Sequence, residues 1–214
     1  MTADWADCVE KVRRWIESDR PIVEWLAGQW PVIVSPVHGD LNANNIFLWL
    51  DRGQPFLIDF ACYQDAGHTL QDFARLETEV KFVLMDKEDD SEVSALDHAP
   101  ERLALWRCAE DHQAGPEWAS KCRLKGAHKK YVERAIRLIQ FIRNQAQEVH
   151  RAAFESQSDH QSIGFLPEYW LPLLYHTLRT IGYDTLSPLK RLLAVYSSAQ
   201  LIRQLEHAPC PPTE

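Results

Sequence analysis

Two short apolar runs separated by a turn constrain the fold of this chain more than any other feature. The runs NIFLWL (residues 45–50) and PFLIDF (residues 55–60) flank the tetrapeptide DRGQ, which contains good turn residues. Runs of this length joined by so few residues predict a β-hairpin. The preceding segment PVIVSPV (residues 31–37) is also short and extended, but its two prolines argue against a central strand.

The rest of the chain has the apolar spacing of amphipathic helices. Helices are expected over residues 3–29, 69–85, 100–111, 127–154, 167–181 and 187–207, with Val132, Ile136, Ile139, Ala146 and Val149 on one stripe of the longest. Ser187, followed by Pro188, is suited to cap the last helix. The expected fold class is therefore α+β and mainly helical. We expect one domain over residues 1–214, made of N-terminal helices (1–30), the hairpin segment (31–77) and a helical body (78–208).

Composition and charge narrow the classes of function. The chain has 214 residues, of which 45% are hydrophobic and 25% charged, and this is ordinary for a globular domain. A net charge of −8 disfavours non-specific binding to nucleic acids and to anionic membranes. No apolar run approaches the roughly 20 residues of a membrane span. The five cysteines are scattered, and the N-terminus lacks the apolar core of a signal peptide, so we expect a cytoplasmic protein with reduced thiols.

Two carboxylates and an amide surround the expected hairpin. Asp40 and Asn45 lie on the loop that enters the first strand, and Asp59 follows the second strand. Because a hairpin brings these ends together, the three side chains are expected to converge. Carboxylate and amide oxygens suit Mg²⁺, which shares its remaining positions with phosphates and water. A carboxylate that is not bound to metal can orient a hydroxyl group and accept its proton. This division of labour is typical of phosphoryl transfer.

The same residues resemble a known family. HGDLNANN (residues 38–45) resembles the catalytic loop of aminoglycoside phosphotransferases, choline kinases and related small-molecule kinases, and LIDF (residues 57–60) resembles their metal-binding segment. The following DAGHTLQDFARLE (residues 65–77) is also similar, and it contains the family's later, structural aspartate, here Asp72. The resemblance covers about a fifth of the chain and implies a protein-kinase-like C-lobe. The C-terminal helices are also similar to kinase-like lobes of bacterial signalling and conflict proteins, called ternary-complex-associated domains.

The resemblance implies a role for each site residue. Asp40 would be the catalytic base, Asn45 a Mg²⁺ ligand and Asp59 the main Mg²⁺ ligand, with ATP as the phosphate donor. His38 would brace the loop through hydrogen bonds. Asn42 and Asn44 are expected to be turn formers, and contacts to the phosphates are the alternative. Ala61 stands where the family often has glycine, a mild departure.

A working kinase also needs a lobe that covers the nucleotide. Only 37 residues precede His38, whereas such a lobe needs roughly 60. No glycine-rich phosphate loop and no strand lysine of the kinase type are recognisable. The chain could be a fragment, could receive the lobe from a partner in trans, or could be a non-catalytic signalling or scaffold domain that binds a protein. In the last two cases Trp30 and Trp49 are expected to lie on an exposed apolar surface.

The phosphate acceptor is expected to be a small-molecule hydroxyl group. In the family it is selected by helical insertions, here about residues 86–126 and 155–168. Acidic residues in the first of these could attract a cationic amine, and ordinary surface charge is the alternative. His112, His128, His150, His160 and His176 show no metal-ligand spacing, so they are expected at the edge of the core or on the surface.

Overall fold

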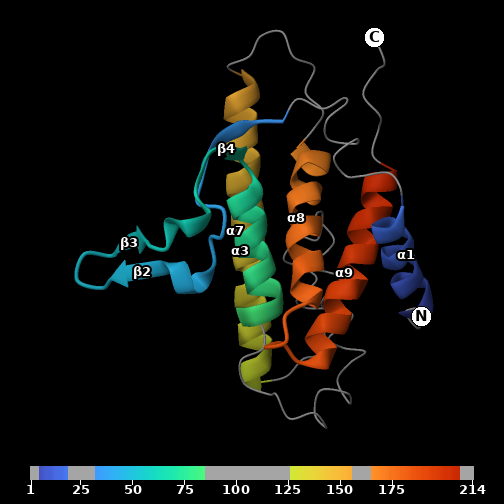
Figure 1. The fold of residues 1–214 in the computed structure, drawn as a ribbon. Helices are drawn as coiled ribbons and strands as arrows, with labels where there is room; N and C mark the ends of the chain where they lie inside the picture. The colour runs from blue at the N-terminus through green and yellow to red at the C-terminus, as the bar shows by residue number, and fades with distance from the viewer. Residues whose placement is uncertain (1–4, 19–31, 85–125, 156–164, 208–214) are drawn as a thin grey trace.

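The computed structural model describes residues 5–18, 32–84, 126–155 and 165–207 (Figure 1). Expectations for residues 19–29, for the helix over 100–111, for the acidic segment after residue 85 and for Trp30 lie outside these ranges. The described chain is α+β and mainly helical, as expected from the sequence.

The elements follow one another in a simple order. The β-structure and the short helical turns around it are β1 (Val34–Val37), η1 (Ala43–Asn45), β2 (Ile46–Trp49), β3 (Gln54–Leu57), η2 (Phe60–Cys62) and β4 (Gln64–His68). The helices are α1 (Trp5–Glu17), α3 (Gln71–Glu79) with its π-helical continuation η3 (Val80–Leu84), α7 (Gly126–Glu155), α8 (Phe165–Ile181) and α9 (Pro188–Glu206). The predicted bounds of α7, α8 and α9 are confirmed to within two residues. Ser187 caps α9 by accepting a hydrogen bond from the Lys190 amide at 3.4 Å.

The predicted hairpin is confirmed. Strands β2 and β3 pair antiparallel, with Ile46 opposite Leu57 and Trp49 opposite Gln54. A second antiparallel pair, β1 with β4, was not expected, because QDAGH has neither β-branched residues nor alternating apolar ones. The register of this pair shifts between Ser35 and Val37, around Pro36. Within the described residues each sheet has two strands, so Pro36 lies in an edge strand, where proline is tolerated.

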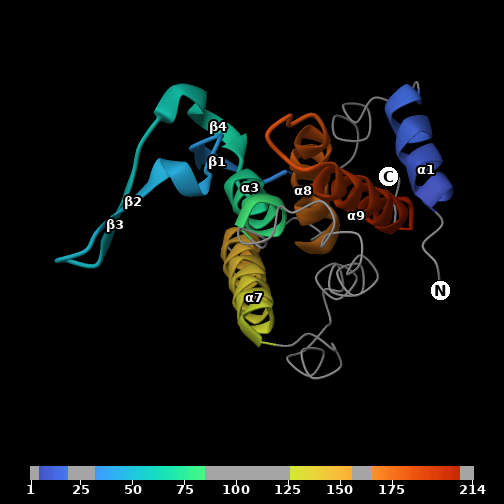
Figure 2. The ribbon, with the colours of Figure 1, turned by 90° about the horizontal axis from the view of Figure 1, so that it is seen from below.

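The described helices form a body from which the hairpin projects. Helix α3 packs against α7 and α8, and α9 packs against α8. Helix α1 contacts α9 on the side of the body away from the hairpin, as both ribbon views show (Figures 1 and 2). The described part of the N-terminal segment therefore does not cover the hairpin.

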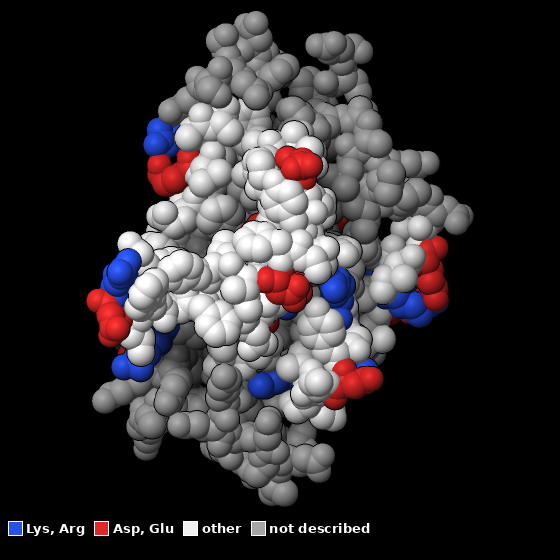
Figure 3. All heavy atoms as spheres, turned by 60° about the vertical axis from the view of Figure 1, so that its left-hand side comes forward, with Lys and Arg blue, Asp and Glu red and all other residues white. Residues whose placement is uncertain are grey.

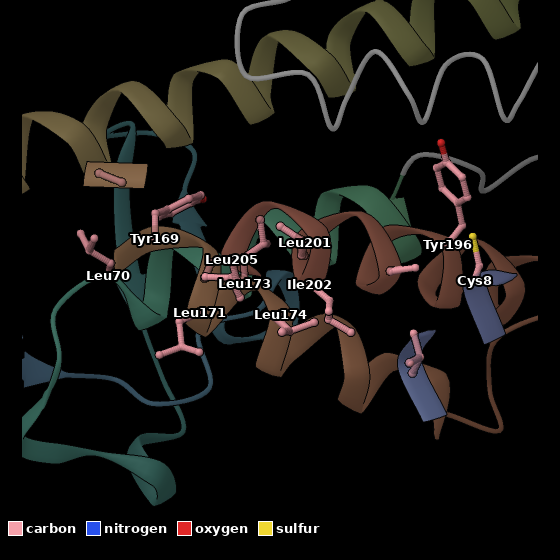
Figure 4. Close-up of a cluster of buried hydrophobic side chains, with 14 residues drawn as sticks. Cys8, Leu70, Tyr169, Leu171, Leu173, Leu174, Tyr196, Leu201, Ile202 and Leu205 are labelled. Carbon is pink, nitrogen blue, oxygen red and sulfur yellow. The ribbon is translucent and has the colours of Figure 1, made fainter. Parts of the chain in front are cut away.

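Among the described residues, two clusters of buried apolar side chains form the core. The larger cluster joins α1, α3, α7, α8 and α9, and Figure 4 shows Leu173, Leu174, Leu201 and Ile202 at its centre. The smaller cluster joins η3, α7 and the start of α9. Ile136, Ile139 and Ala146 of the expected stripe on α7 are buried, and Val149 is 38% exposed.

A buried carboxylate connects three parts of the helical body. Glu77 of α3 is fully buried and accepts two hydrogen bonds from Arg143 of α7, at 2.6 and 2.8 Å. The hydroxyl group of Tyr169 in α8 donates to the same carboxylate at 2.8 Å. The Lys81 ammonium group lies 2.8 Å away and is also fully buried. Since a buried charge is tolerated only when it is paired and hydrogen-bonded, this network fixes how α3, α7 and α8 meet.

Replacing Glu77 by alanine is expected to lower the free energy of unfolding by about 3–5 kcal/mol, because Arg143 and Lys81 would remain buried and would both lose the Glu77 carboxylate. Urea denaturation of the variant would measure this. Glu148→Ala is the matched control, because Glu148 pairs with Arg151 on the exposed face of α7. Its cost should stay below about 1 kcal/mol. Equal costs for the two variants would contradict this account of Glu77.

Candidate functional site

The loop after β1 turns sharply at a glycine that no other residue can replace without strain. Gly39 has φ = +85°, a conformation that residues with a side chain rarely adopt. A Cβ atom at this position would lie 2.0 Å from the carbonyl oxygen of Cys62. The loop and the η2 turn therefore approach each other as closely as their backbones allow.

Asp72 holds this loop from the first turn of α3. Its two carboxylate oxygens accept hydrogen bonds from the backbone amides of His38, at 2.7 Å, and Gly39, at 3.0 Å. Gln71 also donates from Nε2 to the Gly39 carbonyl oxygen at 3.3 Å. The position of the loop thus follows the position of α3. These contacts are of the kind expected for a structural aspartate.

His38 connects the loop to the base of the hairpin. Its Nε2 atom lies 2.7 Å from the carbonyl oxygen of Ile58, which requires a proton on Nε2, and its ring packs against Phe60 with centroids 4.7 Å apart. The amide of Ile58 donates in turn to the Asn45 carbonyl oxygen at 3.0 Å. These bonds bring Asn45 and the segment that carries Asp59 to the same end of the hairpin.

Two asparagines organise the turn between Asp40 and β2. Asn42 caps the η1 turn by accepting the Asn44 amide at 3.0 Å, as expected of a turn former, and donates to the Asp40 carbonyl oxygen at 3.1 Å. Asn45 is buried and donates from Nδ2 to the same Asp40 oxygen at 2.9 Å. Because Nδ2 is engaged, Oδ1 is the atom that Asn45 could offer to a cation.

Asp59 has a strained backbone. It has φ = 60° and ψ = 63°, the left-handed region, and is the sole residue other than glycine with positive φ in the described ranges. Aspartate adopts this region more readily than most residues with a side chain, but it still costs about 1–3 kcal/mol, and such residues cluster at functional sites. The residue is exposed, and no hydrogen bond or ion pair of its carboxylate is found among the described residues. The strain therefore presents a free carboxylate at the base of the hairpin.

Asp40 is held by an arginine that sequence reasoning missed. Arg75 of α3 donates from Nε to the Asp40 carboxylate at 2.8 Å and from Nη1 to Glu79 at 3.0 Å. Burial by itself would raise the pKa of Asp40. The hydrogen bond and charge of Arg75, the charge of Arg179 and a hydrogen bond from Asn42 outweigh it, so the pKa is lowered. Asp40 is therefore ionised at neutral pH. The sequence did contain a signal for this residue. Arg75 follows Asp72 by three positions, a spacing that predicts both side chains on the same face of the helix.

Comparison with protein families identifies the chain. Residues 22–166, about two thirds of the sequence, match the family model described as ternary complex associated domain 9. The chain belongs to this family. The match includes the loop, the hairpin, α3 and α7. No curated protein and no solved structure matches the chain. None of the described helices is long and apolar enough to cross a membrane.

The described residues of this ternary complex associated domain offer few ligands for a metal ion. In the described ranges no group of three or more His, Cys, Asp or Glu side chains could hold a metal ion. A site built from Asp59 and the Asn45 amide would therefore provide only two protein ligands. This number fits Mg²⁺ bound together with phosphate and water, and it does not fit a closed structural zinc site.

Two histidines of the domain are more buried than expected. Nε2 of His150 lies 2.9 Å from a Glu168 carboxylate oxygen, and both side chains are about 5% exposed. His176 of α8 is 2% exposed, and neither of its ring nitrogens has a hydrogen-bond partner in the part of the chain that the structure describes. Burial lowers the pKa of His176 to about 3, helped by the charges of Arg75 and Arg179 and opposed by Asp40. The expectation that these two histidines lie at the core edge or on the surface was wrong.

Gly39→Ala is expected to destabilise the domain by roughly 3 kcal/mol or more, because it combines positive φ with a backbone clash. Gly53→Ala is the matched control, since Gly53 also has positive φ but open space around its Cα. It should cost only about 1–2 kcal/mol. Chemical denaturation measures both, and similar losses would show that the contact with Cys62 relaxes easily.

Acid is expected to destabilise the domain through His176. Since the folded-state pKa is about 3 and the ordinary value is 6.5, only the unfolded chain takes up the proton between these values. The contribution of His176 to the free energy of unfolding is therefore fully present above about pH 6.5. Below that pH the free energy of unfolding falls by up to about 1.4 kcal/mol per pH unit. His176→Gln should flatten this dependence between pH 4 and 7. Replacing the exposed His207 by glutamine should leave the pH dependence unchanged, because the buried His176 ring stays in place.

Proposed function

We propose that this domain is a kinase-like phosphotransferase lobe that binds magnesium and ATP at the base of the hairpin. Asp59 would be the main Mg²⁺ ligand and Asn45, through Oδ1, the second. Bound Mg²⁺ would neutralise phosphate charge and hold the phosphates in place. The observation that carries the proposal is the state of Asp59 beside the loop held by Asp72. Its backbone is strained, and its carboxylate has no partner among the described residues.

Asp40 would act on the acceptor, a hydroxyl group of a small molecule. Its carboxylate is one-third exposed, so part of it can receive a hydrogen bond from that hydroxyl. Arg75 fixes one oxygen and Asn42 contacts the other at 3.3 Å, which restricts the direction the carboxylate faces. Since its pKa is lowered, Asp40 would mainly orient the hydroxyl and accept its proton late in the reaction.

The lobe would be incomplete without a partner. The expected nucleotide-covering lobe has no counterpart among the described elements, and the surface above the site is the exposed hairpin. A lobe or protein supplied in trans would cover it. Trp49 is 43% exposed there, as expected for such a surface.

A non-catalytic scaffold domain, a degenerate kinase lobe that binds a protein, is the second candidate. The hairpin favours it, because Phe47, Leu48 and Leu50 are 57%, 62% and 87% exposed. Exposed apolar surface of this extent marks a protein-binding site. The family description, which refers to a ternary complex, supports this candidate too.

A thermal-shift titration with ATP, with and without Mg²⁺, separates the two candidates. At a hundredfold excess over the dissociation constant, ligand should stabilise the fold by about 2.7 kcal/mol, which raises the melting temperature by roughly 5–10 °C. Asp59→Asn should abolish the Mg²⁺-dependent part. Asp51→Asn, at the tip of the same hairpin, should preserve it. Absence of any shift in a folded protein would contradict unaided nucleotide binding and favour the scaffold candidate.

A further inference from the structure

The register of the hairpin gives it two different apolar faces. Paired residues of antiparallel strands point to the same side, and neighbours along a strand alternate. Phe47, Trp49 and Phe56 therefore share one face, where the rings of Trp49 and Phe56 are 5.8 Å apart. Leu48 and Leu57 occupy the other face, which is aliphatic. Each of these five residues is more than 40% exposed.

The exposed apolar surface extends from the tip of the hairpin to the candidate site. Nine large apolar residues from Phe47 to Tyr63 are between 42% and 87% exposed: Phe47, Leu48, Trp49, Leu50, Phe56, Leu57, Ile58, Phe60 and Tyr63. They lie on both faces of the hairpin and at its base. The aromatic face alone, with Phe47, Trp49 and Phe56 at roughly half of the area that such side chains can bury, presents on the order of 300 Å². With this side turned forward, Figure 3 shows a broad surface with few charged groups.

Two opposite charges lie at the two ends of this surface. Arg52 is at the tip, with its guanidinium carbon 4.3 Å from the centre of the Trp49 ring, so it belongs to the aromatic face. Asp59 is at the base. Neither side chain forms an ion pair with another residue in the described ranges. Six residues of mostly extended chain separate them by on the order of 20 Å, so they do not pair within one molecule.

We propose that a second copy of the chain docks on the hairpin, with the two aromatic faces packed together and the hairpins antiparallel. This arrangement places the tip of each hairpin at the base of the other, where Arg52 of one copy meets Asp59 of the second copy. A two-fold axis makes this contact twice. The hairpin stands clear of the helices in both ribbon views, so the two helical bodies lie at opposite ends of the joined hairpins (Figures 1 and 2).

The proposal identifies the partner of the docking surface, and it does not require the domain to bind nucleotide. In the dimer, the Asp59 carboxylate is paired with Arg52 of the second copy and is not available to Mg²⁺. The proposal is therefore tested in the absence of Mg²⁺ and ATP, so its failure is distinct from failure of the phosphotransferase proposal. Sedimentation equilibrium of the full chain measures association. The wild type should show a species of twice the chain mass of 24.8 kDa at micromolar to tens of micromolar concentration.

Charge reversal gives the decisive measurement. Arg52→Asp and Asp59→Arg should each weaken association at least tenfold, because each homodimer would then contain two like-charged contacts. An equimolar mixture of the two variants should associate as the wild type does, since both contacts between unlike chains are of opposite charge. Circular dichroism verifies that each variant is folded. Arg52→Asp lies at an exposed turn, so it remains informative if Asp59→Arg disturbs the base of the hairpin.

The two faces of the hairpin provide a matched pair of controls. Phe47→Lys should abolish association, whereas Leu48→Lys, equally exposed on the opposite face, should leave it within about threefold. A wild type that stays monomeric at all concentrations, as it would if the hairpin served another protein or a membrane, overturns the proposal. A dimer that is indifferent to charge reversal, or a mixture of the two charge variants that fails to associate, also overturns it.

Discussion

The buried carboxylate of Glu77 is the interaction on which the rest of the structure depends. It brings Arg143 of α7, Tyr169 of α8 and Lys81 of η3 to one point inside the helical body. Paired charges of this kind add little net stability compared with a well-packed apolar core, but their geometry is restrictive. Helix α3 is therefore fixed in position and rotation. The same helix carries Asp72 and Arg75, so the loop and Asp40 are placed by a contact that lies outside the site.

This arrangement explains how a loop with few apolar contacts can have a defined shape. The loop is held by hydrogen bonds from its own amides to Asp72 and by the bond between His38 and Ile58. Each of these bonds has one end on a rigid element or at the hairpin base. The strain at Asp59 is sustained because the residues on either side of it are fixed.

The sequence was sufficient for the features that depend on local pattern. The hairpin, the bounds of α7 to α9 and the Ser187 cap all follow from spacing, turn residues and capping, and these signals are contained in a few neighbouring positions. The β1–β4 pair was missed because its stability comes from long-range hydrogen bonds and from Gly67, where a Cβ atom would lie 2.2 Å from Val37. The β-strand propensity of individual residues contains no information about such a long-range contact.

For the site, the sequence indicated which residues to consider but did not reveal how they are held. Asp40, Asn45 and Asp59 stood out by residue type and spacing, yet residue type did not single out Asp59 among the aspartates as the one with left-handed backbone. The pair of Arg75 with Asp40 joins positions 35 apart, and the burial of His176 depends on neighbours from other elements. These features arise only when the chain is packed.

The isolation of the hairpin also has a thermodynamic consequence for the free chain. Two strands without a third strand or a covering helix are marginally stable in water, and both outer edges of this pair lack a further strand in the described structure. The hairpin thus belongs to the part of the molecule that opens at low free energy, while α3 and its buried network open only with global unfolding. Any molecule that covers the hairpin must offset the conformational entropy lost when the hairpin becomes ordered. Part of the binding free energy is therefore used to order the hairpin, which lowers the affinity and raises the dissociation rate.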